Sequence, residues 1–502
     1  MLLLVLLCPL ASAQSGDWPQ WGRTRERNMV SNEKNMPVDF AAGKFVGTTD
    51  EIDRSSTRNI KWIAKLGSQS YGNPTVAGGR VYVGTNNDVP RDPRFKGDRS
   101  CVYCLDEQTG DLIWQLNVRK LGTGKVSDWE FLGICSSPAV DGNRVYLVTN
   151  LCEVICLDVE GMANGNDGPF KDEGKYMAGP GKPPMEVKKT DADIIWVTNM
   201  TDECGVFPHN ITSCSVLVVG DRIWTSTSNG VDYGHVETPA PNAPSLIVLD
   251  KRTGKLLGEE NSGLSQRIFH SNWSSPAYLE TDEEELAIFG GPDGFVYAFK
   301  PDPVKDEDGY CVLEEAWRFD CNPPGYRMKD GKPIKYATRN GPSEVLGTPV
   351  VYEGRVHALI GQDPEHGEGA GNLVCIDSKG RQVWSYRKIN RSMSTMSIVD
   401  DLLFAADYSG FVYCLDAETG KEHWVHDTSG HIWGSTLAVD GKVYIGSEDG
   451  FLTILPASKE YAKDKVIEVD MTSPIHSSPI AANGVLYVAT QTHLFAIQKP
   501  AR

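Results

Sequence analysis

Histidine, tryptophan and asparagine side chains stand close to a short recurring motif, Ser-Ser-Pro, and their types suit ligand binding. The motif occurs at residues 136–138, 274–276 and 477–479, with the variant Thr348-Pro349. Imidazole nitrogens bind metal ions and indole rings stack on flat ligands, so converging side chains of these types predict a site for a metal, a ring system or a sugar. The candidates are His209, Asn210, His270, Asn272, Trp273, His431, Trp433 and His476. The favoured interpretation, however, is that they fill the channel and hydrogen-bond to one another without a ligand.

Twelve cysteines offer a second kind of chemistry. Cys101 and Cys104 are three apart on an expected strand, where their side chains point to opposite faces, which excludes a zinc or redox pair. One position of a repeated phrase holds Cys104, Cys156, Cys375 and Cys414, and Ala298 and Ala496 in other copies, which predicts small buried hydrophobic residues. Two further pairs, Cys204 with Cys214 and Cys311 with Cys321, either form disulfides or stay free thiols, because spacing does not fix the Cα distance.

The repeated phrase identifies the elements that must position these residues. A strand such as Arg-Val-Tyr-Val-Gly is followed by a strand ending in Cys-Leu-Asp, a Thr-Gly turn and a strand that closes on Trp. The clearest copies are residues 411–424 and 101–114, while residues 248–258 have Gly258 where Trp is expected. The closing tryptophans are expected to pack across the neighbouring unit as structural residues. They are Trp62, Trp114, Trp196, Trp317, Trp384 and Trp424.

The number and period of the copies predict the fold. The last three begin at residues 402, 442 and 485, which gives units of 40 to 43 residues, typical of the blades of a β-propeller. The second strand of each unit is expected at residues 80–84, 144–148, 222–226, 285–289, 355–359, 402–406, 442–446 and 485–489. The sequence therefore predicts an all-β, eight-bladed propeller of four-stranded antiparallel blades. Insertions at about 161–193 and 300–314 are expected to form loops on one face.

The last unit lacks a fourth strand, because residues 494–497 lie close to the C-terminus. Residues 59–66 (NIKWIAKL) have the missing pattern, so an N-terminal strand is expected to complete the last blade and close the ring. The expected organisation is a signal peptide over residues 1–13, an N-terminal extension over 14–58, and the propeller over 59–502. Residues 1–13 (MLLLVLLCPLASA) have the short apolar core and small residues of an export signal, too short to span a membrane, which predicts a periplasmic or otherwise exported protein.

The formal net charge of -18 argues against nucleic acid, whose binding depends on basic patches. The acidic turns at 164–168 and 302–309 lack the ligand spacing of a calcium loop, so no metal site is expected there. The sequence also lacks the zincin helix, the Walker loop and the nucleophile elbow.

The phrase Leu-Asp-x-x-Thr-Gly-x-x-x-Trp resembles the repeat of the pyrroloquinoline-quinone (PQQ)-like β-propeller family, which includes quinoprotein dehydrogenases and the outer-membrane assembly factor BamB. The lead Asp-Trp-Pro-Gln-Trp-Gly at residues 17–22 is similar to the start of bacterial members. Dehydrogenases of this family usually hold PQQ between a Trp and a ring formed by two adjacent bonded cysteines, beside calcium or a lanthanide. If this chain were such an enzyme, the resemblance would imply the same set of residues. This sequence has no Cys-Cys pair, and Cys135-Ser136 cannot form that ring.

The leading hypothesis is therefore a non-catalytic exported propeller, monomeric and without a membrane span, that binds an envelope protein or a carbohydrate on its inserted-loop face. The alternative is a PQQ-dependent dehydrogenase that oxidises an alcohol or a sugar, uses calcium, and stacks Trp273 or Trp433 on the quinone. A carbohydrate lyase or hydrolase would need convergent carboxylates that the sequence does not place.

Overall fold

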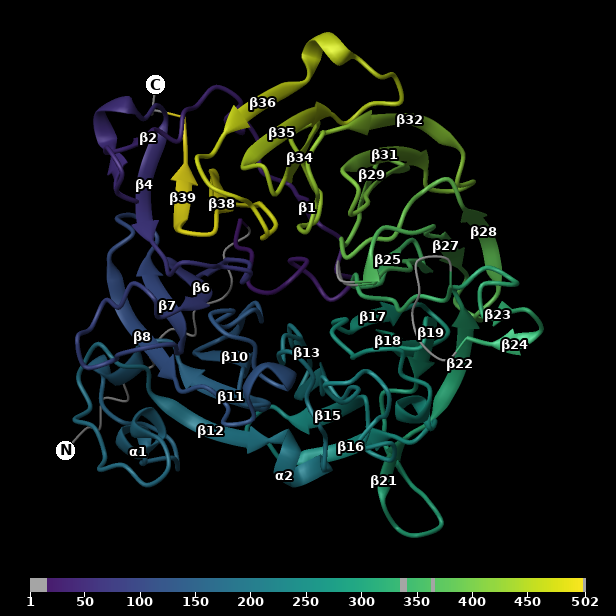
Figure 1. Cartoon of the computed structure of the whole chain (residues 1–502), viewed down its shortest axis with the longest axis horizontal. Helices are drawn as coiled ribbons and strands as arrows, with labels where there is room; N and C mark the ends of the chain where they lie inside the picture. The colour runs from purple at the N-terminus through teal and green to yellow at the C-terminus, as the bar shows by residue number, and fades with distance from the viewer. Residues whose placement is uncertain (1–15, 335–340, 363–365, 500–502) are drawn as a thin grey trace, which may run out of the picture.

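The computed structural model describes residues 16–334, 341–362 and 366–499, which form eight sheets around a central axis (Figure 1). Each sheet contains a meander of four antiparallel strands, and two sheets carry additional strands. The predicted eight-bladed, all-β propeller is confirmed. The predicted signal peptide lies outside the described residues. No helix among the described residues is both long and apolar enough to cross a membrane.

The blades are numbered here in chain order, starting from the first blade whose four strands are consecutive. Blade 1 comprises β5 (Thr75–Ala77), β6 (Arg80–Asn86), β7 (Ser100–Asp106) and β8 (Leu112–Val118), and blade 2 comprises β9 (Ala139–Asp141), β10 (Arg144–Thr149), β11 (Glu153–Asp158) and β12 (Ile194–Asn199). Blade 3 comprises β13 (Leu217–Val219), β14 (Arg222–Ser226), β15 (Leu246–Asp250) and β16 (Leu256–Glu260). Blade 4 comprises β17 (Ala277–Glu280), β18 (Glu285–Gly290), β19 (Phe295–Phe299) and β22 (Glu315–Asp320). Blade 5 comprises β25 (Val350–Tyr352), β26 (Arg355–Leu359), β27 (Leu373–Ile376) and β28 (Gln382–Tyr386), and blade 6 comprises β29 (Ser397–Val399), β30 (Leu402–Ala406), β31 (Phe411–Asp416) and β32 (Glu422–Asp427). Blade 7 comprises β33 (Leu437–Val439), β34 (Lys442–Gly446), β35 (Phe451–Pro456) and β36 (Ile467–Asp470). Blade 8 comprises β37 (Ile480–Ala482), β38 (Val485–Ala489), β39 (His493–Ile497) and β4 (Ile60–Lys65).

Short elements lie between and beside the blades. They are β1 (Val30–Ser31), β2 (Lys44–Phe45), β3 (Ile52–Asp53), β20 (Val304–Lys305), β21 (Cys311–Leu313), β23 (Met328–Lys329), β24 (Lys332–Pro333), the helices α1 (Glu173–Ala178) and α2 (Met200–Cys204), and the 3-10 turns Arg54–Ser56, Gly124–Val126, Gly161–Ala163, Leu264–Gln266 and Lys463–Lys465.

The second strand of every blade lies where the sequence predicts it. The observed bounds are identical to the predicted ones for β14, β26, β30, β34 and β38, while β6, β10 and β18 run one or two residues further. These strands combine β-branched and aromatic residues, and a turn that contains Gly or Asp precedes each of them, so local pattern and final structure agree.

One small residue in the third strand allows an aromatic side chain and the closing Trp to pack across it. In blade 1, Cys104 is paired with Tyr82 on one side and Trp114 on the other. The strand register shifts directly after Cys104, which produces a bulge before the closing strand. The prediction of small buried residues at this position is confirmed, since Cys104, Cys156, Cys375 and Cys414 are at most 1% exposed.

The six closing tryptophans each join their blade to the next, at six of the eight junctions of the ring. The indole N–H of each donates a hydrogen bond to a backbone carbonyl in the following blade. The pairs are Trp62 with Glu107, Trp114 with Val159, Trp196 with Lys251, Trp317 with Ser378, Trp384 with Ala417, and Trp424 with Ser458, at 2.8–3.2 Å. Burial of such a ring contributes at most roughly 4–6 kcal/mol.

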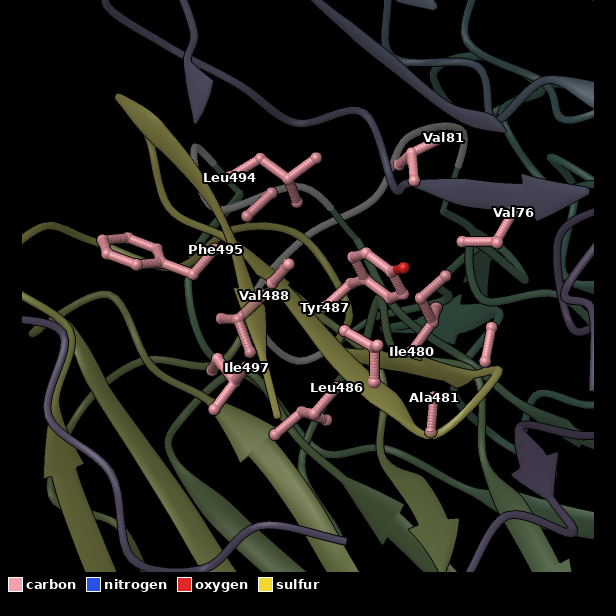
Figure 2. Close-up of a cluster of buried hydrophobic side chains, with 14 of the residues drawn as sticks. Val76, Val81, Ile480, Ala481, Leu486, Tyr487, Val488, Leu494, Phe495 and Ile497 are labelled. Carbon is pink, nitrogen blue, oxygen red and sulfur yellow. The ribbon is translucent and has the colours of Figure 1, made fainter. Parts of the chain in front are cut away.

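The predicted closure is confirmed. Strand β4 pairs antiparallel with β39, with Trp62 opposite Ala496 and Ala64 opposite Leu494. Figure 2 shows the core of this blade, where Tyr487 and Ile480 lie near Val76 and Val81 of blade 1. The first and last parts of the chain therefore share one sheet.

Residues 16–33, called the N-terminal belt here, contact all eight blades at one end of the channel; part of the belt is visible as the purple trace inside the ring in Figure 1. Its strand β1 pairs in parallel with β33 of blade 7. The contacts to the other blades are Gly16 with Asn483, Trp18 with Val76, Pro19 with Val140, Arg25 with Tyr278, Glu26 with Val351, Arg27 with Val216 and Asn28 with Ile398. The sequence did not predict this arrangement.

Both predicted insertions connect the third and fourth strands of their blades, β11 to β12 and β19 to β22, so they leave the ring at the same end, and each then extends to a neighbouring blade. Residues 161–193 leave blade 2 and lie along β8 of blade 1, where Gln115 and Ala192 are joined by a backbone hydrogen bond of 2.9 Å. Residues 300–314 leave blade 4 and form β20 and β21, and β21 pairs in parallel with β16 of blade 3. Both insertions therefore cover the outer edge of the preceding blade, which is otherwise open to strand addition.

Neither of the two cysteine pairings is formed. Cys204, Cys214, Cys311 and Cys321 are all free thiols. Cys311 is exposed on β21, in the sheet of blade 3, whereas Cys321 is buried after β22 of blade 4. Cys214 is fully buried and its Sγ accepts a hydrogen bond from the Ser226 N–H at 3.3 Å. The partners of each pair therefore belong to different local environments.

Candidate functional site

The meander topology decides which connections surround each end of the channel. In a four-stranded blade, the second connection within the blade and the link to the next blade lie at the same end. The predicted candidates all lie in blade-to-blade links: 205–216 carries His209 and Asn210, 261–276 carries His270 to Trp273, 428–436 carries His431 and Trp433, and 471–479 carries His476. These links are at the end opposite the N-terminal belt.

Each blade contributes one residue to a ring around the axis, called the axial ring here. These residues occupy the position immediately before Ser-Ser-Pro or its variants, and together they line a cavity of about 200 Å³. The axial ring consists of Tyr71, Cys135, Ser213, Trp273, Leu346, Met393, Trp433 and His476. Sequence reasoning found Trp273, Trp433 and His476, and alignment of all eight links on Ser-Ser-Pro was the signal that locates the other five.

Two residues further along each link lies a second ring of polar residues, called the hydroxyl ring here. It consists of Asn73, Ser137, Ser215, Ser275, Thr348, Thr395, Ser435 and Ser478. Backbone N–H groups in this ring donate to the side-chain oxygen of the equivalent residue in the next blade, as in Thr395 to Ser435 and Ser435 to Ser478, both at 2.8 Å. Trp21 of the belt donates from its indole N–H to Thr348 Oγ1 at 2.9 Å. The motif Ser-Ser-Pro therefore ties neighbouring blades together beneath the axial ring.

Outside the axial ring the channel widens into a cavity of about 410 Å³, called the axial well here. Its lining residues are Tyr71, Trp129, Leu132, Cys135, Asn210, Ile211, Ser213, Trp273, Leu346, Met393 and Trp433. The volume falls in the range of roughly 300–1,000 Å³ typical of small-molecule sites. Burial raises the pKa of Tyr71 to about 12 and that of Cys135 to about 12, so both are neutral at physiological pH.

A group of charged and aromatic residues lies beside Trp433. The ring of His431 stacks on Tyr408 at 4.5 Å, and its nitrogens lie 3.3 Å from Glu368 and 3.4 Å from Glu448. His476 stacks on Tyr71 at 4.8 Å, with its Nε2 3.8 Å from Glu448. Burial lowers the pKa of His476, which favours its neutral form, although Glu448 opposes that shift.

The remaining predicted residues do not line the well. Asn272 is buried and its amide donates to the carbonyl of Asn229 and the hydroxyl of Ser245, both at 3.0 Å, which is a structural role. His209 and His270 instead meet each other behind Trp273, with their Nε2 atoms 2.8 Å apart. His235 and His366, which sequence reasoning did not single out, lie against the same pair.

Comparison with known proteins gives similarities at two levels. A family model described as outer membrane protein assembly factor BamB matches residues 369–464. A stretch of 86 residues is 34% identical to the quinoprotein alcohol dehydrogenase PedH of Pseudomonas putida, and this match covers 16% of the chain and only 14% of that enzyme.

Solved structures share the fold over nearly the whole chain. BamB from Moraxella catarrhalis has a TM-score of 0.54 and 14% identity, with 87% of this chain and 98% of that chain covered. A europium-containing methanol dehydrogenase has a TM-score of 0.58 and 12% identity, with 95% and 91% covered. Quinohemoprotein alcohol dehydrogenase from Comamonas testosteroni has a TM-score of 0.58 and 12% identity, with 98% and 82% covered. At these identities the likeness establishes the fold alone.

Proposed function

We propose that this PQQ-repeat β-propeller is a binding protein whose axial well takes a neutral carbohydrate. Because the chain resembles both BamB and quinoprotein dehydrogenases, the fold does not decide between their functions, and its own function depends on the residues around its axis. The observation that carries this proposal is the composition of the well. Aromatic rings form much of its wall, and polar hydrogen-bonding groups lie at its base.

The wall supplies faces for the apolar sides of sugar rings. Trp129, Trp273, Trp433 and Tyr71 all line the well and are only partly buried. The indole N–H of Trp273 already donates to the backbone carbonyl of Ile211 at 3.0 Å, so this residue offers mainly its ring to a ligand. Large aromatic surfaces of this kind contribute strongly to binding and set the orientation of a ring-shaped ligand.

The base supplies hydrogen-bonding groups without charge. The smaller cavity is lined by Ser215, Ser275, Thr348, Thr395, Ser435 and Ser478, whose hydroxyl oxygens each already accept one hydrogen bond from a protein N–H. Hydroxyl groups both donate and accept hydrogen bonds, which matches the hydroxyl groups of a sugar. Asn210 adds an amide near the mouth of the well.

The same lining does not fit PQQ, the cofactor of the structurally similar dehydrogenases. PQQ carries carboxylates, and among the described residues that line either axial cavity there is no Lys or Arg to pair with them. Buried carboxylates without a cationic or equivalent donor set are strongly unfavourable. The lining also includes no carboxylate to bind calcium, and Cys135 is followed by Ser136. We therefore assign no PQQ-dependent reaction to the chain.

The exported location expected from the sequence is part of the proposal, since the described residues do not include the signal segment. An extracytoplasmic propeller with a sugar site would act on glycans of the cell envelope or its surroundings. The inserted segments do not build the well, so the proposed binding face is the one formed by the blade-to-blade links.

The test is a binding screen with the full chain. Intrinsic tryptophan fluorescence and calorimetry would follow titration with glucose, cellobiose, maltose, N-acetylglucosamine oligomers and peptidoglycan fragments. We expect saturable binding of at least one saccharide and a loss of affinity of about tenfold or more in Trp433→Ala, from removal of one stacking face. The control is Tyr310→Ala, which removes an aromatic ring that is 65% exposed on the hairpin at the outer edge.

Two outcomes would contradict the proposal. The first is the absence of saturable binding to every saccharide in the panel. The second is saturable binding of PQQ with calcium, accompanied by dye reduction with an alcohol or a sugar, which would favour the dehydrogenase alternative.

A further inference from the structure

Three chain segments that are distant in sequence bring His209, His235 and His270 to one place. His209 lies in the link after α2, His235 in the connection between β14 and β15, and His270 in the link after β16. Bridges join Pro208 to Asn229 and Gly230 to Ser271, and the Val231 N–H donates to the His270 carbonyl at 2.9 Å. The backbone of all three segments is therefore held together next to the imidazoles.

Gly230 is required for this approach. A Cβ atom at this position would lie 2.5 Å from the Cβ of His209 and 2.7 Å from the His270 carbonyl oxygen. Any larger residue would push the two histidine segments apart. The close approach of the imidazoles is thus built into the backbone.

The imidazole nitrogens converge. One ligand atom from each of His209, His235 and His270 lies within 4.8 Å of the others, and the Nε2 atoms of His209 and His270 are 2.8 Å apart. Tetrahedral zinc at 2.0–2.1 Å from each nitrogen needs nitrogens about 3.3 Å apart. Small side-chain movements would bring all three nitrogens to that spacing.

The hydrogen bond on the far side of His209 sets its tautomer. Its Nδ1 lies 2.6 Å from the Val231 carbonyl oxygen, which can only accept, so Nδ1 carries the proton. In the neutral ring, Nε2 then presents a lone pair toward His235 and His270. A carbonyl that accepts the second N–H is the usual partner of a metal-bound histidine.

His270 has a comparable neighbour. The amide of Gln362 lies 3.5 Å from its Nδ1, and with the amide oxygen turned toward the ring it would accept the Nδ1–H. His209 and His270 are at most 1% exposed, whereas His235 is partly exposed on a loop whose Tyr233 is 74% exposed. His235 is therefore the most exposed of the three histidines.

We propose that His209, His235 and His270 bind a divalent transition-metal ion of the zinc class. Imidazole donors favour zinc, copper, nickel or cobalt over calcium and magnesium, which prefer oxygen. Three protein ligands leave coordination positions for water or a small ligand. The site lies behind the wall of the well, since the His270 ring is 5.0 Å from that of Trp273, and it does not depend on what the well binds.

The experiment treats the full chain with a chelator, removes the chelator, and titrates zinc, cobalt or calcium chloride into the protein by calorimetry. We expect one zinc per chain, no calcium binding, and visible absorption bands of low-symmetry cobalt. His235→Ala should weaken zinc binding by about 100-fold or more, and it should abolish the rise in Tm that zinc gives the unsubstituted protein. His235→Gln serves if the alanine variant does not fold.

The matched control is His423→Ala, on the outer strand β32 of blade 6, which should leave zinc affinity unchanged. The proposal is overturned if the unsubstituted protein binds none of the transition metals stoichiometrically. It is also overturned if zinc affinity is the same in His235→Ala and His235→Gln as in the unsubstituted protein. In either case the close contact between His209 and His270 would be a hydrogen bond between imidazoles.

Discussion

At the scale of single residues, substitutions within the repeat show which of its features are essential. His357 occupies the position of Tyr82 and Tyr146 in other blades, and its ring lies 5.8 Å from that of Trp384. Burial lowers the pKa of His357 from its ordinary value of 6.5 to about 4. The histidine is therefore neutral in the folded protein, and protonation favours unfolding.

This predicts an acid-sensitive contribution to stability. Because the pKa is lower in the folded state, the contribution is present above pH 6.5 and is lost as the pH falls from 6.5 toward 4, by about 3 kcal/mol in total. His357→Tyr restores the repeat residue and should remove this part of the pH dependence. The measurement is the free energy of unfolding in urea at pH 7.5 and pH 4.5 for both proteins. Equal losses of stability in the two proteins would show that His357 does not titrate on unfolding.

Two turn glycines have nearly the same backbone conformation but different surroundings. Substituting each of them therefore separates the loss of stability caused by an unfavourable φ from the loss caused by a steric clash. Gly420 and Gly441 have φ of 70° and 68°, respectively. A Cβ on Gly420 would lie 2.5 Å from the Trp384 ring, whereas nothing lies within 4 Å of one on Gly441. We expect Gly441→Ala to cost about 1 kcal/mol and Gly420→Ala about 3 kcal/mol, measured by chemical denaturation. Similar losses in both variants would mean that Trp384 moves aside without penalty.

At the scale of elements, the hairpin β20–β21 compensates for a missing tryptophan. Gly258 occupies the closing position of blade 3, and a Cβ there would lie 2.7 Å from Pro303. Pro303 precedes β20, so the inserted segment occupies space beside the position that a closing Trp fills in other blades. The same segment pairs with the outer strand β16 through β21.

We therefore expect that replacing residues 302–313 with a short turn exposes the edge of β16 and causes concentration-dependent aggregation. The matched control replaces the exposed hairpin Met328–Pro333 with Asn-Gly, since β23 and β24 pair only with each other among the described residues. Light scattering and analytical ultracentrifugation would compare the variants. A monomeric, stable protein without residues 302–313 would disprove the protective role.

At the scale of the whole molecule, the ring is held together both at its closing blade and through the N-terminal belt. Arg27 of the belt is fully buried, and its guanidinium donates to the carbonyls of Trp21, Pro276 and Val216 at 2.5, 2.8 and 2.9 Å. Burial lowers the pKa of Arg27 to about 9, so it is still charged at neutral pH. One side chain thus joins the belt to blades 3 and 4.

Arg27→Met should lower the free energy of unfolding by about 3–5 kcal/mol, because several buried carbonyls lose a charged donor. Arg25→Met is the matched control, since Arg25 forms exposed ion pairs with Glu26 and Glu280 and should cost less than about 1 kcal/mol. Thermal unfolding and limited proteolysis of the N-terminal segment would measure both effects. Equal effects of the two substitutions would show that the belt contributes little to the ring.

The sequence alone determined the repeat and therefore the fold. Strand patterns, turns and closing tryptophans are local features, and a period of about forty residues leaves few ways to bury their apolar faces. The same reasoning identified β4 as the strand that completes the last blade. It also selected Trp273, Trp433 and His476, because they stand next to a recognisable motif.

Only the tertiary structure decided what these residues surround. His235 joins His209 and His270 through a loop of different length and sequence from its neighbours, so no repeat position predicts it. The belt contacts six blades through backbone hydrogen bonds, which carry little sequence signal, and blades 3 and 6 through the side chains of Arg27 and Asn28. The insertions turn back to the preceding blade because its outer edge offers unpaired backbone groups. These contacts join segments far apart in sequence, so they depend on how the folded blades are placed around the ring.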